Sequence, residues 1–214
     1  MIDNILIYSL TSFFILFSIS KISYKLNLLD RPSKRAVHLN PTAYTGGIAL
    51  CFIYVFAIFF FDFSSQKLNL ILSISFLIGI VGFVDDKYNL NVGGKLSLQI
   101  IPIIYLVILE NLRLNHIGDY NYFKLELNSF SIPFTLLAIL FLINSFNYFD
   151  GLDGLLGSAT ITVISILIFL IPDKNIDLFL IIILLPILFF LCFNFSLFKL
   201  PKLFLGDSGS LLLG

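Results

Sequence analysis

The sequence predicts an all-α integral membrane protein, a polytopic helical bundle with seven spans and the start of an eighth. Hydrophobic residues make up 58% of the 214 residues and charged residues only 12%, whereas soluble domains carry about 25% charge. Nearly charge-free apolar runs recur along the chain, and crossing a bilayer takes roughly 17–25 such residues. We therefore treat residues 1–214 as a single transmembrane domain.

The predicted spans follow from these apolar runs, taken in chain order. They cover about residues 5–26, 44–61, 68–84, 94–109, 132–148, 155–171 and 178–198, and the eighth begins at Ser210. The fourth span is the weakest because it is short and contains Pro102. The cytoplasmic loops are expected at about residues 27–45, 85–94, 149–154 and 199–209.

The distribution of basic residues predicts the orientation. The side that receives these four loops carries nine of the 13 Lys and Arg residues, and the other side carries the remaining four. Because the richer side is normally cytoplasmic, we expect the N-terminus outside. The formal net charge of zero and the lack of a basic face give no support for nucleic-acid binding.

The most informative polar stretch follows the fifth apolar run. Asn144, Asn147 and Asp150 are spaced by three, so they lie near one face of a helix end. Asp153 follows, and a glycine after each aspartate lets the backbone leave the helix and approach a ligand. Amide and carboxylate oxygens of this kind suit a hard divalent cation, although a plain polar loop explains the stretch about equally well when taken alone.

Further carboxylates fall on the same predicted side. Asp85 and Asp86 are adjacent like charges that repel unless a cation or water relieves them, and Lys95 follows nearby. Asp207 lies between glycines at the start of the eighth helix, where Ser208 and Ser210 are candidates to cap that helix or to bind phosphate. Charges at helix ends are common in membrane proteins, but their recurrence on one side predicts a composite site.

The first predicted cytoplasmic loop offers hydrogen-bond donors. Lys34, Arg35 and His38 suit a diphosphate, and the Gly46-Gly47 pair allows close backbone approach. The alternative is a basic segment that anchors to anionic lipid.

Together these motifs resemble the polyprenyl-phosphate N-acetylhexosamine-1-phosphate transferases, of which the phospho-N-acetylmuramoyl-pentapeptide transferases are more distant relatives. The resemblance rests on residues 30–47, the pair Asp85-Asp86, residues 144–155 and residues 204–210, in the same order as in that family. It implies a transferase, dependent on Mg²⁺ or on Mn²⁺ in its place, in the bacterial inner membrane. Such an enzyme moves a HexNAc-1-phosphate, with GlcNAc-1-phosphate as first choice, from a UDP-sugar to undecaprenyl phosphate. UMP is released, and the lipid-linked sugar starts a cell-surface glycan such as O-antigen. The resemblance is also compatible with a homodimer.

The resemblance also implies a role for each matching residue. The metal ligands would be Asp207 and Asn147, and the catalytic carboxylates would be Asp85, Asp86 and Asp150. The substrate-binding residues would be Lys34, Arg35, His38, Lys95, Asp153 and Phe204, the last stacking on uracil.

The sequence departs from the family at three points. Tyr44-Thr45 stand where many members have a basic or hydrophobic pair, and Asn194 lies further from Asp207 than in the common pattern, so it is not assigned a role. Members also continue beyond the position of Gly214 with further spans and a loop rich in His and Arg, so we expect residues 1–214 alone to be catalytically incomplete.

Three other functions fit parts of the sequence. Residues 150–154 match the start of the CDP-alcohol phosphotransferase motif, but Gly157-Ser158 stand where Ala-Arg is expected. A prenyltransferase would use Asp85-Asp86, but it lacks a second motif of that type. A transporter would place ionisable groups near the bilayer midplane, whereas these spans are nearly free of charge.

Overall fold

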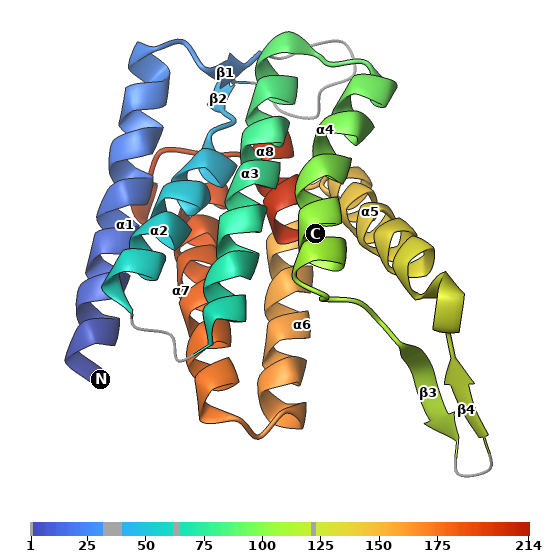
Figure 1. The fold of residues 1–214 in the computed structure, drawn as a ribbon. Helices are drawn as coiled ribbons and strands as arrows, with labels where there is room; N and C mark the ends of the chain where they lie inside the picture. Colours follow the sequence, from blue (N-terminus) through green and yellow to red (C-terminus); the bar gives the residue numbers. More distant parts are fainter. Residues whose placement is uncertain (1, 32–39, 62–64, 121–122) are drawn as a thin grey trace.

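Helices dominate the computed structural model, which describes residues 2–31, 40–61, 65–120 and 123–214 (Figure 1). This confirms the predicted fold class. The helices are α1 (Ile2–Lys25), α2 (Gly46–Phe60), α3 (Gln66–Tyr88), α4 (Val92–Ile104), α5 (Ser131–Phe149), α6 (Leu155–Leu170), α7 (Lys174–Asn194) and α8 (Gly206–Leu213). Short 3₁₀ turns cover Asn128–Phe130 and Leu197–Lys199.

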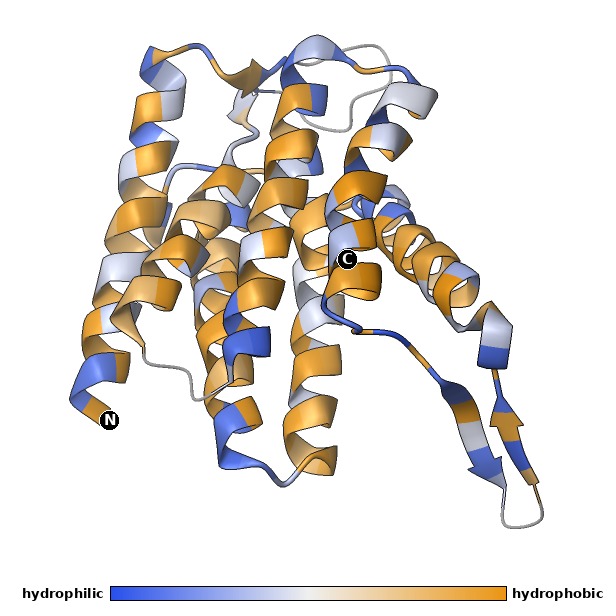
Figure 2. Ribbon diagram, viewed as in Figure 1, coloured by the Kyte–Doolittle hydropathy of each residue, from blue (hydrophilic) through white to orange (hydrophobic). Residues whose placement is uncertain are grey.

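The bundle surface is apolar along most of its height, as expected for helices that face lipid (Figure 2). Within the described ranges, five helical segments are long and apolar enough to cross a membrane: Ile2–Lys25, Gln66–Tyr88, Val92–Leu109, Asn128–Phe149 and Lys174–Asn194. The apolar helices α2 and α6 are shorter. The protein is therefore a helical membrane protein, while the count of seven spans stays a prediction.

The short helix α8 lies inside the bundle and packs against α2, α3 and α5 (Figure 1). Its residues from Ser208 to Leu212 are buried. This depth is possible because glycines face it: a Cβ added at Gly47 would lie 1.9 Å from the backbone nitrogen of Gly209. The helix begins four residues before the predicted start at Ser210, so Asp207 is in its first turn.

The irregular end of α4 agrees with the weakness of the fourth predicted span. Pro102 lies inside the helix, and residues Tyr105–Leu109 continue it as a π-helical turn. Proline has no backbone N–H and its ring clashes with the preceding turn, which favours such a change in helix geometry.

The connection between α3 and α4 is shorter than the predicted loop at 85–94. Helix α3 continues through both aspartates to Tyr88, so Asp85 and Asp86 are in its last turns. Asn89 ends the helix in a left-handed conformation with φ 50°. The side chain of Asn91 then accepts a hydrogen bond from the Gly94 nitrogen at 2.7 Å and caps α4.

Two short antiparallel hairpins interrupt the helical pattern, and the sequence did not predict them. The pair β1 (Leu29–Asp30) and β2 (Thr42–Ala43) contacts the segment that leads into α8, because the Phe204 nitrogen donates to the Ala43 carbonyl at 2.7 Å. The pair β3 (His116–Tyr120) and β4 (Phe123–Glu126) connects α4 to α5 at the other end of the bundle (Figure 1).

Candidate active site

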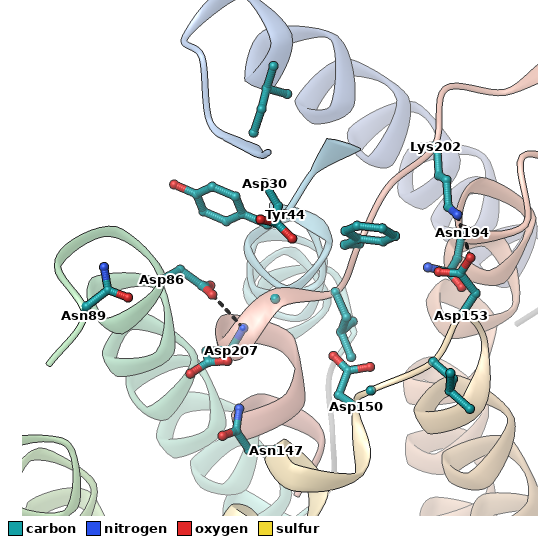
Figure 3. A pocket seen from close by; sticks show the side chains of 16 residues that line it. Asp30, Tyr44, Asp86, Asn89, Asn147, Asp150, Asp153, Asn194, Lys202 and Asp207 are labelled. Carbon is teal, nitrogen blue, oxygen red and sulfur yellow. Dashed lines mark hydrogen bonds and ion pairs between the residues drawn. The ribbon is translucent and has the colours of Figure 1, made fainter. Parts of the chain in front are cut away.

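A cavity of about 890 Å³ opens where the ends of α3, α5 and α7 meet the start of α8 (Figure 3). Its lining is rich in carboxylates: Asp30, Asp86, Asp150, Asp153 and Asp207. The other lining residues are Leu29, Tyr44, Asn89, Asn147, Gly151, Leu152, Asn194, Lys202, Phe204, Leu205 and Gly206. Residues far apart in the sequence thus form one site, as the sequence predicted.

The side chain of Lys95 joins four helices at the edge of this cavity. Its Nζ lies 2.7 Å from Asp85 Oδ2 on α3 and 2.6 Å from Asp207 Oδ2 on α8. It also donates to Asn147 Oδ1 on α5 at 3.2 Å. Charge-assisted hydrogen bonds of this kind are the stronger ones in proteins, so Lys95 fixes the positions of these three side chains.

A second pair of contacts holds Asn147 in place. Its Nδ2 donates to Ser210 Oγ at 2.8 Å, which turns the amide oxygen toward Lys95. One turn away on each helix, Asn144 Nδ2 donates to Gln99 Oε1 at 2.9 Å. Asn147 and Asn144 therefore pair with Lys95 and Gln99, which are one turn apart on α4. Asn144 thus faces α4 instead of the cavity.

The carboxylate of Asp86 caps helix α8 from a different helix. Its Oδ1 accepts from the Asp207 nitrogen at 2.9 Å and its Oδ2 from the Ser208 nitrogen at 3.1 Å (Figure 3). A negative charge at a helix N-terminus is favourable, because the free amides carry partial positive charge. Of the two roles considered for Ser208 and Ser210, capping is not found: their hydroxyls donate to the carbonyls of Leu205 and Asp207.

Two glycines let the start of α8 come this close to α3. Gly206 has φ +72°, and a Cβ there would lie 2.8 Å from Asp86 Oδ2. At Gly82 a Cβ would lie 2.3 Å from the Asp207 carbonyl oxygen. Any larger residue at Gly82 would have to push α8 away, and Asp207 would move with it.

The opposite wall of the cavity carries Asp150 and Asp153 from the α5–α6 connection. Asp153 Oδ2 pairs with Lys202 Nζ at 2.5 Å, and that ammonium lies 5.2 Å from the centre of the Phe204 ring. Burial, then the charges of Asp207 and Asp153, raise the pKa of Asp150 to about 6. The raised pKa makes Asp150 better suited than an ordinary aspartate to exchange a proton near neutral pH.

The donor atoms around Lys95 fit Mg²⁺. Two carboxylates and one amide oxygen converge on a single cationic group, and Mg²⁺ is commonly held by one or two carboxylates together with substrate phosphates. The part of the chain that the structure describes has no cluster of three His, Cys, Asp or Glu side chains able to hold a metal alone.

Comparison with known sequences identifies the family. Residues 68–214 match the family described as glycosyl transferase family 4. The chain belongs to this family. Undecaprenyl-phosphate alpha-N-acetylglucosaminyl 1-phosphate transferase from Salmonella typhi is 27% identical over 221 residues, which cover 99% of this chain and 59% of that protein.

Two further relatives with the same description extend the comparison. The protein from Pasteurella multocida (strain Pm70) is 31% identical over 222 residues, covering 100% of this chain and 62% of the relative. The protein from Escherichia coli (strain K12) is 26% identical over 217 residues, covering 99% and 59% respectively. The chain therefore spans about three fifths of the length of these relatives.

The structure of this family 4 chain brings together most of the predicted site residues. Those at the site are Asp85, Asp86, Lys95, Asn147, Asp150, Asp153, Phe204 and Asp207. Lys34, Arg35 and His38 lie outside the described residues.

Sequence reasoning missed five polar lining residues: Asp30, Tyr44, Asn89, Asn194 and Lys202. Asn194 is 4% exposed, and its Nδ2 donates to the Leu203 carbonyl at 3.0 Å, which ties α7 to the segment before α8. Its position in the last turn of an otherwise apolar helix was a usable indication. Spacing to Asp207 was a poor guide, because the irregular turn between α7 and α8 sets the distance in space.

Proposed function

We propose that this family 4 protein transfers an N-acetylhexosamine-1-phosphate, with GlcNAc-1-phosphate as first choice, from a UDP-sugar to undecaprenyl phosphate. An oxygen of the lipid phosphate attacks the phosphorus that carries the sugar, and the bond between the two phosphates of the donor breaks. UMP leaves, and the sugar becomes linked to the lipid through a diphosphate. The observation that carries the proposal is the convergence of Asp85, Asn147 and Asp207 on Lys95 from separate helices.

The charges of the cavity support phosphoryl transfer. Both substrates are anionic, so the site needs cations to bring them together. Lys95 and Lys202 stand at two sides of a cavity whose other charged residues are carboxylates. Asp207 and Asn147 would hold Mg²⁺, which when bound neutralises the phosphate charges and stabilises the departing UMP.

The carboxylates divide into two roles in this proposal. Asp85 accepts from the Leu90 nitrogen at 2.8 Å with one oxygen and binds Lys95 with the other, so it positions the lysine. Asp150 lines the cavity, and no hydrogen bond to its carboxylate occurs within the described ranges. With its raised pKa, Asp150 is suited to take a proton from the lipid phosphate.

The place of the cavity supports a lipid acceptor. It lies at one end of a bundle whose sides are apolar, so a phosphate at the membrane surface reaches it while its hydrocarbon chain stays in the bilayer (Figure 2). We assign this end to the cytoplasm, where UDP-sugars occur, which puts the N-terminus on the opposite side. This assignment rests on the distribution of basic residues.

The test is product identification by mass spectrometry. The protein, expressed from its complete reading frame and purified in detergent, is incubated with undecaprenyl phosphate, Mg²⁺ and either UDP-GlcNAc or UDP-GalNAc. The proposal expects a lipid-linked HexNAc diphosphate and an equal amount of UMP, formed only when lipid and Mg²⁺ are both present. A complete reaction that yields neither UMP nor a lipid-linked HexNAc diphosphate, while a parallel incubation with a CDP-alcohol yields CMP, would overturn it.

A further inference from the structure

The hairpin of β3 and β4 has one apolar and one polar face. In its register Tyr120 is opposite Phe123 and Gly118 is opposite Leu125, so these four share one face. The residues on the other face are all polar: Asp119 opposite Lys124, with Nζ and Oδ2 at 3.0 Å, and His116 opposite Glu126. A bulge at Ile117 separates the His116–Glu126 pair from the Gly118–Leu125 pair.

The apolar face is continuous and open. The Tyr120 and Phe123 rings stack with centroids 5.2 Å apart, and the Tyr120 ring also covers Gly118, where a Cβ would lie 2.8 Å from the ring. Tyr120, Phe123 and Leu125 are 53%, 60% and 45% exposed. The hairpin projects away from the bundle, so none of the helices that the structure describes covers this face (Figure 1). A two-stranded hairpin is marginal in water, so its apolar face needs a partner.

The surface to which the hairpin is joined indicates this partner. Leu109 ends the membrane-crossing segment before the hairpin and is 66% exposed, and Phe130 lies in the first turn of the next such segment and is 73% exposed. The hairpin is thus joined at both ends to membrane-crossing segments that expose apolar side chains. Aromatic residues favour the boundary between lipid and water, and tyrosine can keep its hydroxyl in the wet layer.

We propose that the apolar face of this hairpin lies on the lipid surface, at the end of the bundle opposite the cavity. Asp119, Lys124 and Glu126 then face water on the other side of the hairpin. The hairpin ends shortly before the start of α5, whereas the cavity is lined by Asn147 and Asp150 at the other end of this 19-residue helix. The hairpin would tie the outer ends of α4 and α5 to the membrane surface, independently of catalysis.

The chain contains no tryptophan, so a single introduced tryptophan reports on its own surroundings. Phe123→Trp places it on the apolar face, and Lys124→Trp places it on the polar face one residue away. Phe141→Trp, at a 72% exposed position in the middle of α5, sets the scale for a residue in lipid. Each variant is reconstituted into phosphatidylcholine vesicles with and without bromine in the upper acyl chain, which quenches tryptophan by contact.

We expect Phe123→Trp to lose roughly half its fluorescence in brominated lipid, as interfacial apolar groups reach the headgroup–acyl boundary, and Lys124→Trp to lose far less. Leu125→Trp repeats the measurement on the same face, in case position 123 disturbs the strand pairing. Equal quenching at positions 123 and 124 would overturn the proposal. So would a blue-shifted emission at 123 and 125 without quenching, because this would indicate a protein partner or a second copy.

Discussion

The Lys95 ammonium lies 2.6 Å from a carboxylate oxygen of Asp207, a residue 112 positions further along the chain. The same ammonium is 2.7 Å from Asp85, so one cation separates two carboxylates that would otherwise repel. The contact requires the first turn of α4 and the first turn of α8 to face each other across the end of α3. Lys95 is therefore the residue on which the geometry of the site depends most.

Replacing this lysine should abolish most activity. Lys95→Gln leaves the two carboxylates facing each other without a cation, and we expect UMP release to fall by about 10²-fold or more, as for other electrostatic stabilisers in active sites. Lys124→Gln is the matched control, because Lys124 pairs with the exposed Asp119 on the hairpin. Activity of Lys95→Gln within a few-fold of the control would show that Lys95 has no role in transfer.

Asp86 should act by holding α8 in place. Asp86→Asn replaces one acceptor oxygen by an NH₂ group that faces a backbone N–H, so the cap is partly lost. We expect a loss of about 1–2 kcal/mol in unfolding free energy. Thermal unfolding in detergent measures this, with Asp173→Asn as control, because Asp173 caps the exposed start of α7 by accepting from Asn175.

An unchanged midpoint for Asp86→Asn would contradict the capping role. A second readout separates positioning from direct catalysis. If Asp86 only positions Asp207, the variant should need more Mg²⁺ for half-maximal rate while keeping measurable turnover at saturating Mg²⁺.

Because α3 approaches α8 closely at Gly82, we expect this position not to tolerate a larger side chain. In Gly82→Ala the new methyl group would lie 2.3 Å from the Asp207 carbonyl oxygen and 2.6 Å from the Ser208 Cα. Both neighbours are backbone atoms, so α8 must shift and activity should fall severely. Gly93→Ala is the control, since its nearest atom is 3.7 Å away. Similar activities of the two variants, measured by UMP release, would show that α8 tolerates displacement.

The stability of the metal-free protein should depend on pH through Asp150. Its folded pKa is about 6, above the value of about 3.9 expected in an unfolded chain. The folded state thus binds the Asp150 proton more tightly than the unfolded chain does. The contribution of this group to the free energy of unfolding is fully present below about pH 4 and is lost as the pH rises through about 6. Thermal unfolding in the presence of EDTA measures this decrease in stability with pH. Asp150→Asn should abolish the decrease, and Asp119→Asn should not. A wild-type curve that is flat between these pH values would contradict the prediction.

The sequence predicted the helices well because lipid-facing segments are read directly from hydropathy. Observed helix ends differ from the predicted ones by at most four residues when the π-turn Tyr105–Leu109 is counted with α4. The hairpins were missed because β1 and β2 are two residues each and β3 has a bulge, so neither shows a clear alternation.

The sequence predicted that the carboxylates of the site share one side of the membrane, because the side follows from counting spans. It did not predict the hydrogen-bond partners of these carboxylates, because pairing depends on which helix faces are in contact. Nothing in the spacing indicates that Asp86 binds the amides of Asp207 and Ser208, or that Asn147 lies between Lys95 and Ser210. These contacts need the glycine-lined approach of α8, which only the packing of α2 and α3 reveals.

The most direct test of the proposed site is the rate of UMP release by Asp207→Asn across a range of Mg²⁺ concentrations. The variant is made in the protein expressed from its complete reading frame and assayed with UDP-GlcNAc and undecaprenyl phosphate, beside wild type and Asp119→Asn. Asparagine keeps the shape but removes the charge that binds Lys95 and would hold Mg²⁺. We expect a loss of about 10²-fold or more for Asp207→Asn and none for Asp119→Asn. Near-normal turnover of Asp207→Asn at limiting Mg²⁺ would contradict the assignment of this site.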